Sequence, residues 1–141
     1  MMKEQRVKDW MTTNVISITP DTLLTDAHRL MKEKNIRRLP VMKDGELVGI
    51  VTRGDVREAE PSSATTLTIW ELNYLLAKLK VSQIMTPEVR TIHQDATIAE
   101  AAKLMLDHKI SGLPVVDDGN RVVGIITESD IFRLVVQKWH Q

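Results

Sequence analysis

Apolar residues recur at the spacing of a helix face in two segments, from Leu24 to Met31 and from Ile98 to Met105. Positions i, i+3 and i+7 are hydrophobic in both segments, which predicts one amphipathic helix in each. Thr97 and Glu100 have the spacing of a capping box before the second helix, whereas Leu23 takes the place of that threonine before the first. We therefore expect the first helix to begin less sharply.

Short apolar runs on either side of these helices predict strands. Ile16 and Ile18 mark a first strand before one helix, and Val89 and Ile92 mark its counterpart before the other. After each helix, two apolar runs are separated by a turn sequence, KDGE or DDGN, which is typical of a β-hairpin. A short second helix follows each hairpin, so the order strand, helix, strand, strand, helix occurs twice.

The two halves of the chain are copies of one sequence pattern. GIVTRGDV (residues 49–56) aligns with GIITESDI (residues 124–131), and a Leu-Pro-Val step precedes both. We assign residues 7–59 to the first repeat, 60–80 to a linker and 81–136 to the second repeat. One such unit has too little apolar area to be stable alone. We therefore expect an α/β (α+β) fold in which the two repeats pack sheet to sheet as one pseudo-symmetric module.

The linker contains a predicted helix with an apolar stripe. Five apolar residues fall at helical spacing after the loop-forming residues 61–63: Ile69, Leu72, Leu75, Leu76 and Leu79. Trp70 and Tyr74 in the same segment either lie in a dimer interface, where aromatic residues are enriched, or pack on the chain's own core. The sequence leaves both interpretations open.

Two Thr-x-x-Asp tetrapeptides, Thr52 to Asp55 and Thr127 to Asp130, are the leading candidates for a binding site. Each Thr stands where a strand is expected to end and a helix to begin, beside free N–H groups that suit a phosphate. Each Asp offers two acceptor oxygens, which can hold the neighbouring hydroxyls of a ribose. Gly54 and Ser129 leave room for a ligand near the backbone. The alternative is that both pairs only cap a helix.

A Leu-Pro step in each repeat is the second candidate region. The two segments are Ile36-Arg37-Arg38-Leu39-Pro40 and Ile110-Ser111-Gly112-Leu113-Pro114. Because proline has no N–H to donate to a sheet, we expect the adjoining carbonyl groups to face a cleft and to meet the edge of a flat ring.

Composition restricts the partners of the protein. Lys+Arg and Asp+Glu number 19 each in 141 residues, so no net field would hold nucleic acid or an anionic membrane. The chain has no cysteine, which excludes disulfides and suits a reducing cytoplasm. No apolar run approaches the roughly 18 residues that span a bilayer. We expect a cytoplasmic protein with neither nucleic acid nor membrane as its main partner.

No catalytic or metal-binding pattern is present in the sequence. The four histidines match no metal or nucleophile motif: His28, His93, His108 and His140. Asp117 and Asp118 fall in a predicted hairpin turn, where Asp is favoured for local hydrogen bonding. Four methionines occupy matched positions in the repeats, which predicts core packing: Met11, Met31, Met85 and Met105. We predict no enzyme activity, no catalytic cofactor and no metal.

The doubled pattern of a Leu-Pro-Val step followed by Gly, an apolar run and Thr-x-x-Asp resembles tandem cystathionine β-synthase (CBS) domains. The two repeats together resemble one CBS pair, or Bateman module, over residues 7–136. The linker sequence WELNYLL is similar to that of small stand-alone CBS-pair proteins of the acetoin-utilisation type. The resemblance implies a regulatory module that senses adenosine nucleotides (AMP, ADP or ATP) or S-adenosylmethionine, and that pairs with a second copy into a homodimer.

The resemblance also implies two clefts between the repeats, each made by the Thr-x-x-Asp tetrapeptide of one repeat and the strand and Leu-Pro region of the other. One cleft would join Thr52 and Asp55 to Val89, Arg90, Ile110, Ser111 and Pro114. The other would join Thr127 and Asp130 to Val15, Ile16, Ile36, Arg37, Arg38 and Pro40. In both, the Asp would hold the ribose, the Thr the phosphate and the apolar residues the adenine. We expect Asp130 to stand in an exposed first helical turn that carries little core packing.

Charge distinguishes the two predicted clefts. Arg37 and Arg38 offer forked donors that suit phosphate, whereas Ser111 and Gly112 stand at the matching positions. We therefore expect the cleft with Asp130 to be favoured for a nucleotide, although Glu128 beside Thr127 opposes a polyphosphate. The alternative to a ligand sensor is a non-catalytic scaffold or oligomerisation module with vestigial clefts. An unrecognised enzyme acting on a nucleotide is a third hypothesis, and the sequence names no target protein.

Overall fold

The computed structural model describes residues 5–59 and 68–139, and it divides into two compact units. One unit combines Met1–Val15 with Arg90–Gln141, and we call it the C-terminal unit. The other unit is Ile16–Val89, and we call it the N-terminal unit. The units differ from the repeats seen in the sequence, because the first residues of each repeat belong to the unit built mainly by the other repeat.

The N-terminal unit is built around an antiparallel hairpin. Strands β1 (Arg38–Lys43) and β2 (Glu46–Thr52) pair directly, with Asp44 (φ 52°) and Gly45 (φ 81°) in the turn. These two positive φ angles are those of a tight hairpin turn, which explains the Asp-Gly sequence. Its helices are α2 (Leu24–Lys34), α3 (Arg53–Ala59) and α4 (Ile69–Lys78), followed by a 3-10 turn, Val81–Gln83. The strand predicted at Ile16 and Ile18 is reduced to a single parallel bridge between Ile18 and Val41.

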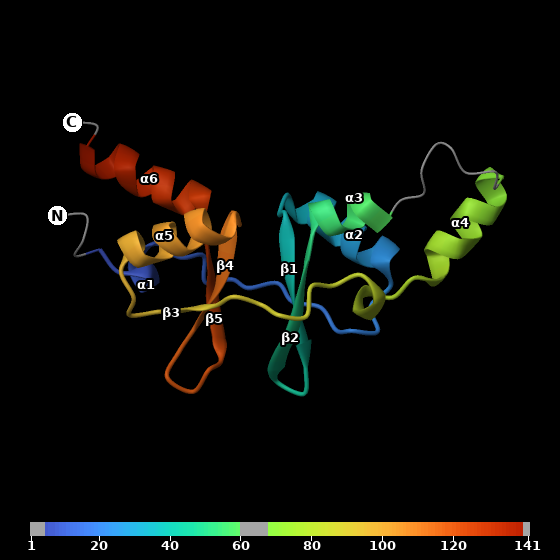
Figure 1. Cartoon of the computed structure of the whole chain (residues 1–141), viewed down its shortest axis with the longest axis horizontal. Helices are drawn as coiled ribbons and strands as arrows, with labels where there is room; N and C mark the ends of the chain where they lie inside the picture. The colour runs from blue at the N-terminus through green and yellow to red at the C-terminus, as the bar shows by residue number, and fades with distance from the viewer. Residues whose placement is uncertain (1–4, 60–67, 140–141) are drawn as a thin grey trace. The chain divides into compact units, whose positions relative to one another are not determined.

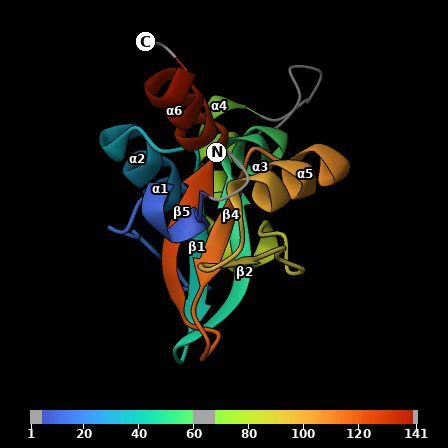
Figure 2. The same cartoon turned by 90° about the vertical axis from the view of Figure 1, so that its left-hand side faces the viewer.

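The C-terminal unit has a three-stranded sheet in the order β3-β4-β5. Strand β3 (Ile92–His93) is parallel to β4 (Gly112–Val116), which is antiparallel to β5 (Val122–Thr127). The unit's helices are α1 (Val7–Trp10), α5 (Ile98–His108) and α6 (Glu128–Trp139). Figures 1 and 2 show these helices gathered on one face of the sheet. The mixture of helices and strands confirms the predicted α/β class.

Each unit has its own hydrophobic core. The helix faces predicted from spacing are buried in both, including Met31 at 1% and Met105 at 4% relative exposure. The core of the N-terminal unit consists of Ile18, Leu24, Ala27, Met31, Leu39, Val41, Val51, Val56 and Val81. The core of the C-terminal unit consists of Val7, Ile92, Ile98, Ala101, Met105, Leu113, Val115, Ile126 and Leu134.

The segment that begins each repeat extends the hairpin of the other repeat. Thr12 forms an antiparallel bridge with Ile125, and its counterpart Thr86 forms one with Ile50. Met11 lies over Gly124 so closely that a Cβ added to this glycine would stand 2.5 Å from the Met11 sulfur. Met85 lies over Gly49 at the same distance. The glycines of the two GI(V/I)T runs are therefore required by the close approach of a methionine.

The helix caps follow the sequence, and the predicted linker helix is present as α4 (Ile69–Lys78). The Thr97 hydroxyl accepts from the Glu100 N–H (3.1 Å), whereas Leu23 provides no side-chain cap, as predicted. In α4, Trp70 is 83% and Tyr74 61% exposed, so the interpretation that they pack on the chain's own core is wrong for the part of the chain described.

Candidate functional site

Both Thr-x-x-Asp tetrapeptides form a reciprocal capping box where a strand runs directly into a helix. At the junction of β2 and α3, the Thr52 N–H donates to Asp55 Oδ2 (2.9 Å), and the Asp55 N–H donates to the Thr52 hydroxyl (3.1 Å). At the junction of β5 and α6, the Thr127 N–H donates to Asp130 Oδ2 (2.9 Å), and the Asp130 N–H donates to the Thr127 hydroxyl (3.4 Å). The capping alternative is thus realised at both positions, and any ligand would have to bind capped turns.

The turn from Thr127 to Asp130 carries two further bonds to the aspartate. The Thr127 hydroxyl also donates to Asp130 Oδ2 (3.2 Å), and the Arg133 guanidinium pairs with Asp130 Oδ1. Asp130 is 3% exposed, whereas Asp55 is only half-buried. The bonds described for Asp55 within its own unit involve its Oδ2 and its backbone N–H. The expectation that Asp130 stands in an exposed first turn is therefore wrong.

Arg133 is the residue near the candidate site that sequence reasoning missed. It stands three residues after Asp130 in α6, a spacing that places two side chains on the same helix face. The matching position in α3, three residues after Asp55, is Glu58, whose carboxylate cannot donate to an aspartate. The available sequence signal was an arginine three residues after the aspartate of the second Thr-x-x-Asp motif, where the first motif is followed by Glu58.

Within each unit, the Thr-x-x-Asp turn adjoins the Leu-Pro region of the same repeat. Arg38 is the strand partner of Thr52, and the Arg53 N–H donates to the Arg37 carbonyl (2.9 Å). Correspondingly, Gly112 pairs with Thr127 in the C-terminal unit, where the Glu128 N–H donates to the Ser111 carbonyl (3.0 Å). The hairpin register causes this, because it brings the start of one strand beside the end of the next.

The two prolines are buried inside the hairpins. The Pro40 carbonyl accepts a hydrogen bond from the Ile18 N–H (3.0 Å), so it takes part in the pairing of Ile18 with β1. The Pro40 carbonyl thus has one donor from within the chain, and the predicted contact between the carbonyls of this region and the edge of a ligand ring stays a prediction. Pro114 is the register partner of Ile125 and is buried as well.

The remaining predicted contact residues are distributed over both units. Val15, Arg90 and Ile110 lie in the unit that contains Asp130. Ile16, Ile36 and Val89 lie in the unit that contains Asp55. The five apolar residues of this group are all half-buried, whereas Arg90 is exposed.

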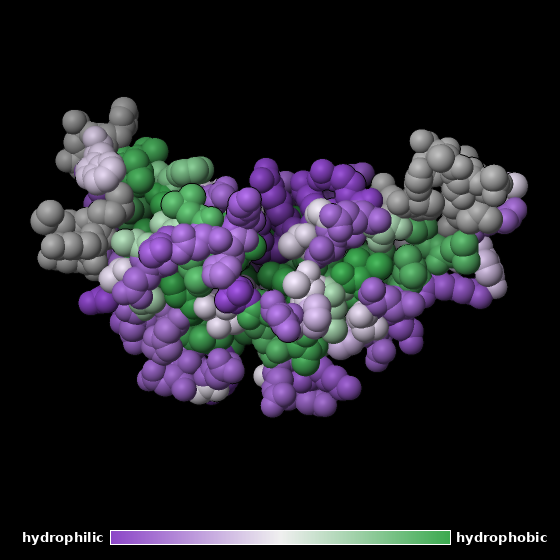
Figure 3. Space-filling model, in the orientation of Figure 1, coloured by the Kyte–Doolittle hydropathy of each residue, from purple (hydrophilic) through white to green (hydrophobic). Residues whose placement is uncertain are grey.

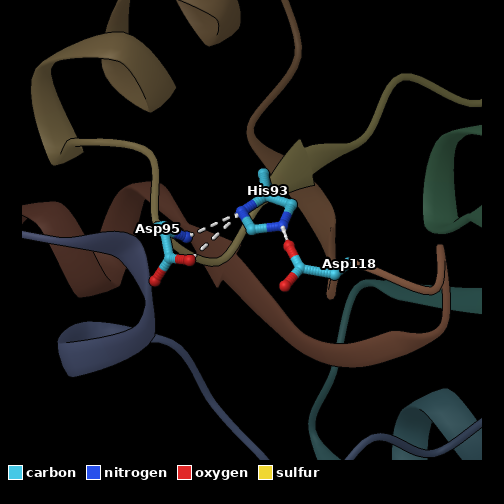
Figure 4. A group of neighbouring side chains, drawn as sticks. All are labelled: His93, Asp95 and Asp118. Carbon is cyan, nitrogen blue, oxygen red and sulfur yellow. Dashed lines mark hydrogen bonds and ion pairs between the residues drawn. The ribbon is translucent and has the colours of Figure 1, made fainter.

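One further polar cluster lies in the C-terminal unit, at His93, Asp95 and Asp118 (Figure 4). The Asp95 N–H donates to His93 Nδ1 (3.1 Å), which leaves Nε2 to carry the ring proton and to donate to Asp118 Oδ1 (2.8 Å). A hydrogen bond from Lys8 holds the pKa of the Asp95 carboxyl below its usual value. Because both ring nitrogens are paired and a lysine neutralises Asp95, the cluster is explained as a link between β3 and the β4–β5 turn.

The family of the chain follows from comparison with known proteins. A family model described as CBS domain matches residues 7–62 and 81–137, and these segments contain both Thr-x-x-Asp turns. The chain belongs to the CBS-domain family. The inosine-5'-monophosphate dehydrogenase of Korarchaeum cryptofilum is 36% identical over 128 residues, which are 91% of this chain and 24% of that protein. The chain thus spans about a quarter of this enzyme.

Solved CBS pairs resemble the chain over nearly its whole length. The CBS domain pair of protein MJ0100, in complex with 5'-methylthioadenosine and S-adenosyl-L-methionine, is 35% identical, with a TM-score of 0.78 and coverage of 95% of this chain and 98% of that one. CBSX2 in complex with AMP is 32% identical, with a TM-score of 0.77 and coverage of 94% and 97%. CBSX2 comes from Arabidopsis thaliana.

An acetoin-utilisation protein, AcuB from Vibrio cholerae, is 31% identical with a TM-score of 0.77, covering 94% of this chain and 90% of that one. This likeness and the two matched segments confirm the resemblance to a tandem CBS pair. As for membranes, none of the helices in the described part of this CBS pair is long and apolar enough to cross a bilayer.

Proposed function

We propose that the protein is a non-enzymatic regulatory module that binds an adenosine-containing ligand at its Thr-x-x-Asp turns. The observation that carries the proposal is the chemistry shared by the ligands of its relatives. AMP, 5'-methylthioadenosine and S-adenosylmethionine occur in complexes of CBS pairs that are 32–35% identical to this chain and align with 94–95% of its length. Their phosphate, thioether and sulfonium groups differ, whereas adenine and ribose are common to all three.

The residues of the two turns suit this common part. Asp55 and Asp130 provide acceptor oxygens for the ribose hydroxyls, and Thr52 and Thr127 stand at the N-terminal ends of helices, where a phosphate is favoured. The residues predicted to complete the sites remain part of the proposal: Val89, Arg90, Ile110, Ser111 and Pro114 for Asp55, and Val15, Ile16, Ile36, Arg37, Arg38 and Pro40 for Asp130. Regulation further requires that the ligand prefers one state of the module.

Calorimetric titration with adenosine, AMP, ADP, ATP, 5'-methylthioadenosine and S-adenosylmethionine tests the proposal, with guanosine as the comparison compound. A ligand at a hundred times its dissociation constant should raise the free energy of unfolding by about 2.7 kcal/mol. Asp55→Asn and Asp130→Asn should each remove or weaken binding, because each takes away the charge that holds the ribose hydroxyls.

Asp26→Asn is the matched control for these variants. Asp26 also lies in the first turn of a helix and pairs with an arginine three residues on, Arg29 (2.6 Å), but it is outside both turns. Unchanged affinity in this variant and reduced affinity in the other two support the proposal. If no adenosine compound binds the wild type saturably, or if bound nucleotide is turned over, the proposal is wrong.

A second candidate function is assembly with another copy of the chain, as a scaffold or homodimer. The observation that favours it is the apolar surface of two helices: Phe132, Val136 and Trp139 are 63%, 56% and 68% exposed on α6, and Trp70 and Tyr74 are exposed on α4. Figure 3 shows hydrophobic residues at the surface over both helices. The three residues of α6 follow the i, i+4, i+7 spacing of a helix-pairing seam.

Sedimentation equilibrium distinguishes this candidate. A homodimer that pairs through α6 should dissociate in Phe132→Ser, while Trp70→Ser in α4 should leave it intact. Dissociation by Trp70→Ser alone would assign the interface to α4. A wild-type chain that is monomeric at all concentrations would leave the scaffold function without support.

A further inference from the structure

The two Thr-x-x-Asp turns differ at the oxygen that a ribose would approach. Asp130 Oδ2 accepts from both the N–H and the hydroxyl of Thr127, so Oδ1 is the oxygen left for other donors. Arg133 occupies that oxygen. At Asp55, the bonds that the structure describes among residues 5–59 and 68–139 are one from the Thr52 N–H to Oδ2 and one from the Asp55 N–H to the Thr52 hydroxyl.

The burial of the Asp130 carboxylate increases the effect of its bond to Arg133 on ribose binding. The Asp130 side chain is 4% exposed, while the Arg133 side chain that pairs with it is 50% exposed. The carboxylate is thus nearly buried and already bonded to a guanidinium that is half exposed, so a ribose hydroxyl that approaches Oδ1 has to displace Arg133. A bond between an arginine and a carboxylate is stronger than one from a neutral hydroxyl, so a ribose has to compete with a better donor.

We infer that Arg133 acts as a latch on Asp130, which makes the Asp55 turn the stronger and the Asp130 turn the weaker of the two ribose sites. Arg133 is a positioning residue, since it acts through the carboxylate. The inference rests on the proposed function, and it reverses the preference for the Asp130 site that the charges of Arg37 and Arg38 suggested. The α3 turn cannot form the same latch, because Glu58 occupies the position that corresponds to Arg133.

The chemistry of the ligand should also matter at the latched site. Arg133 can leave Asp130 at lower cost when the ligand brings an anion to which the guanidinium can move, as AMP does and adenosine does not. The ratio of AMP affinity to adenosine affinity should therefore be larger at the Asp130 turn than at the Asp55 turn. A residue that only stabilised the fold would not change this ratio.

Titration of adenosine and AMP into single-site variants tests the latch. Asp55→Asn leaves the Asp130 turn as the acting site, and Asp130→Asn leaves the Asp55 turn. We expect adenosine to bind about tenfold more weakly to Asp55→Asn than to Asp130→Asn, the difference between a charged and a neutral donor. In the double variant Asp55→Asn/Arg133→Gln, the affinity for adenosine should rise by most of this tenfold difference. The ratio of AMP affinity to adenosine affinity should fall.

Two control substitutions separate the latch from a general effect of charge. Arg133→Lys keeps a cation three residues from Asp130, so it should retain much of the weak adenosine binding. Glu58→Gln, at the matched position of α3, should leave adenosine binding in the Asp130→Asn background within about twofold, since no bond to Asp55 is involved.

Each result decides between the latch and its alternatives. The latch is wrong if Asp55→Asn binds adenosine as tightly as Asp130→Asn does, or if Arg133→Gln changes neither adenosine affinity nor the affinity ratio. In those cases adenosine still binds, and the proposed function stands. If neither compound binds the wild type or any variant, the proposed function and the latch are both wrong.

Discussion

Arg133 is bonded to Asp130, and both stand on the first turns of α6, three residues apart. The same aspartate accepts the Thr127 N–H at its other oxygen, so a single buried carboxylate holds the end of β5 and the start of α6 together. The pairing serves stability whether or not a ligand binds. It also has consequences that can be measured without any ligand.

Asp130→Ala should lower the free energy of unfolding by about 2 kcal/mol, because it removes a buried carboxylate that accepts from the partly buried Thr127 N–H and pairs with Arg133. Asp55→Ala should cost less, since Asp55 is half-buried and makes fewer bonds. Urea unfolding of both variants provides the comparison. Equal losses for the two variants would contradict the difference in their environments.

Gly124→Ala should destabilise the C-terminal unit by about 1–3 kcal/mol through overpacking. The added Cβ would stand 2.5 Å from the Met11 sulfur and 3.0 Å from the Thr12 carbonyl oxygen, and the backbone oxygen cannot move away as a side chain can. Gly54→Ala is the matched control, because its nearest neighbour is the Thr52 hydroxyl at 3.5 Å. In thermal unfolding, the midpoint temperature of Gly124→Ala should be well below those of Gly54→Ala and the wild type. The reverse order would show that the segment around Met11 is not held against β5.

Stability should decrease as the pH falls below about 5, the range in which carboxylates with lowered pKa values are protonated. A hydrogen bond from Lys8 lowers the pKa of Asp95, one from Lys103 lowers that of Asp107, and the Arg121 N–H lowers that of Asp117. A carboxyl whose pKa is lower in the folded state stabilises the protein above its unfolded pKa. That stabilisation is lost as the pH falls through the folded value.

Lys8→Gln tests this assignment, because it removes the donor that lowers the pKa of Asp95. The free energy of unfolding, measured from unfolding curves, should fall less between neutral and acid pH in the variant than in the wild type. Lys43→Gln, at the end of β1, is the control and should keep the wild-type slope. A steeper pH dependence in Lys8→Gln would show that Lys8 does not stabilise the ionised form of Asp95.

Trp70→Ser should change the free energy of unfolding of the isolated chain by less than about 0.5 kcal/mol, because the indole is 83% exposed. Leu134→Ala, in the core of the C-terminal unit, should cost about 2–5 kcal/mol by comparison. Chemical unfolding at low protein concentration measures both. A large loss in Trp70→Ser would mean that the side chain packs against other residues after all.

The sequence predicted the helices and hairpins because their signals are local. The spacing of Leu24, Ala27 and Met31 gave the buried face of α2, and the Asp-Gly pair gave the turn between β1 and β2. It predicted the first strand of the N-terminal unit less well, since one bridge at Ile18 has no separate sequence signature. It also located both Thr-x-x-Asp turns, because a doubled motif is visible without coordinates.

The sequence by itself thus determined the two repeats, their helix faces and the two turns, all of which depend on residues close together in the chain. Only the tertiary structure decided that Met11 and Thr12 pack with the second repeat and that Met85 and Thr86 pack with the first. It also decided that Asp130 is buried and paired with Arg133, while Asp55 is half-buried. The physical reason is that burial and bridging between distant segments depend on which surfaces meet in space, and residue spacing along the chain does not fix that.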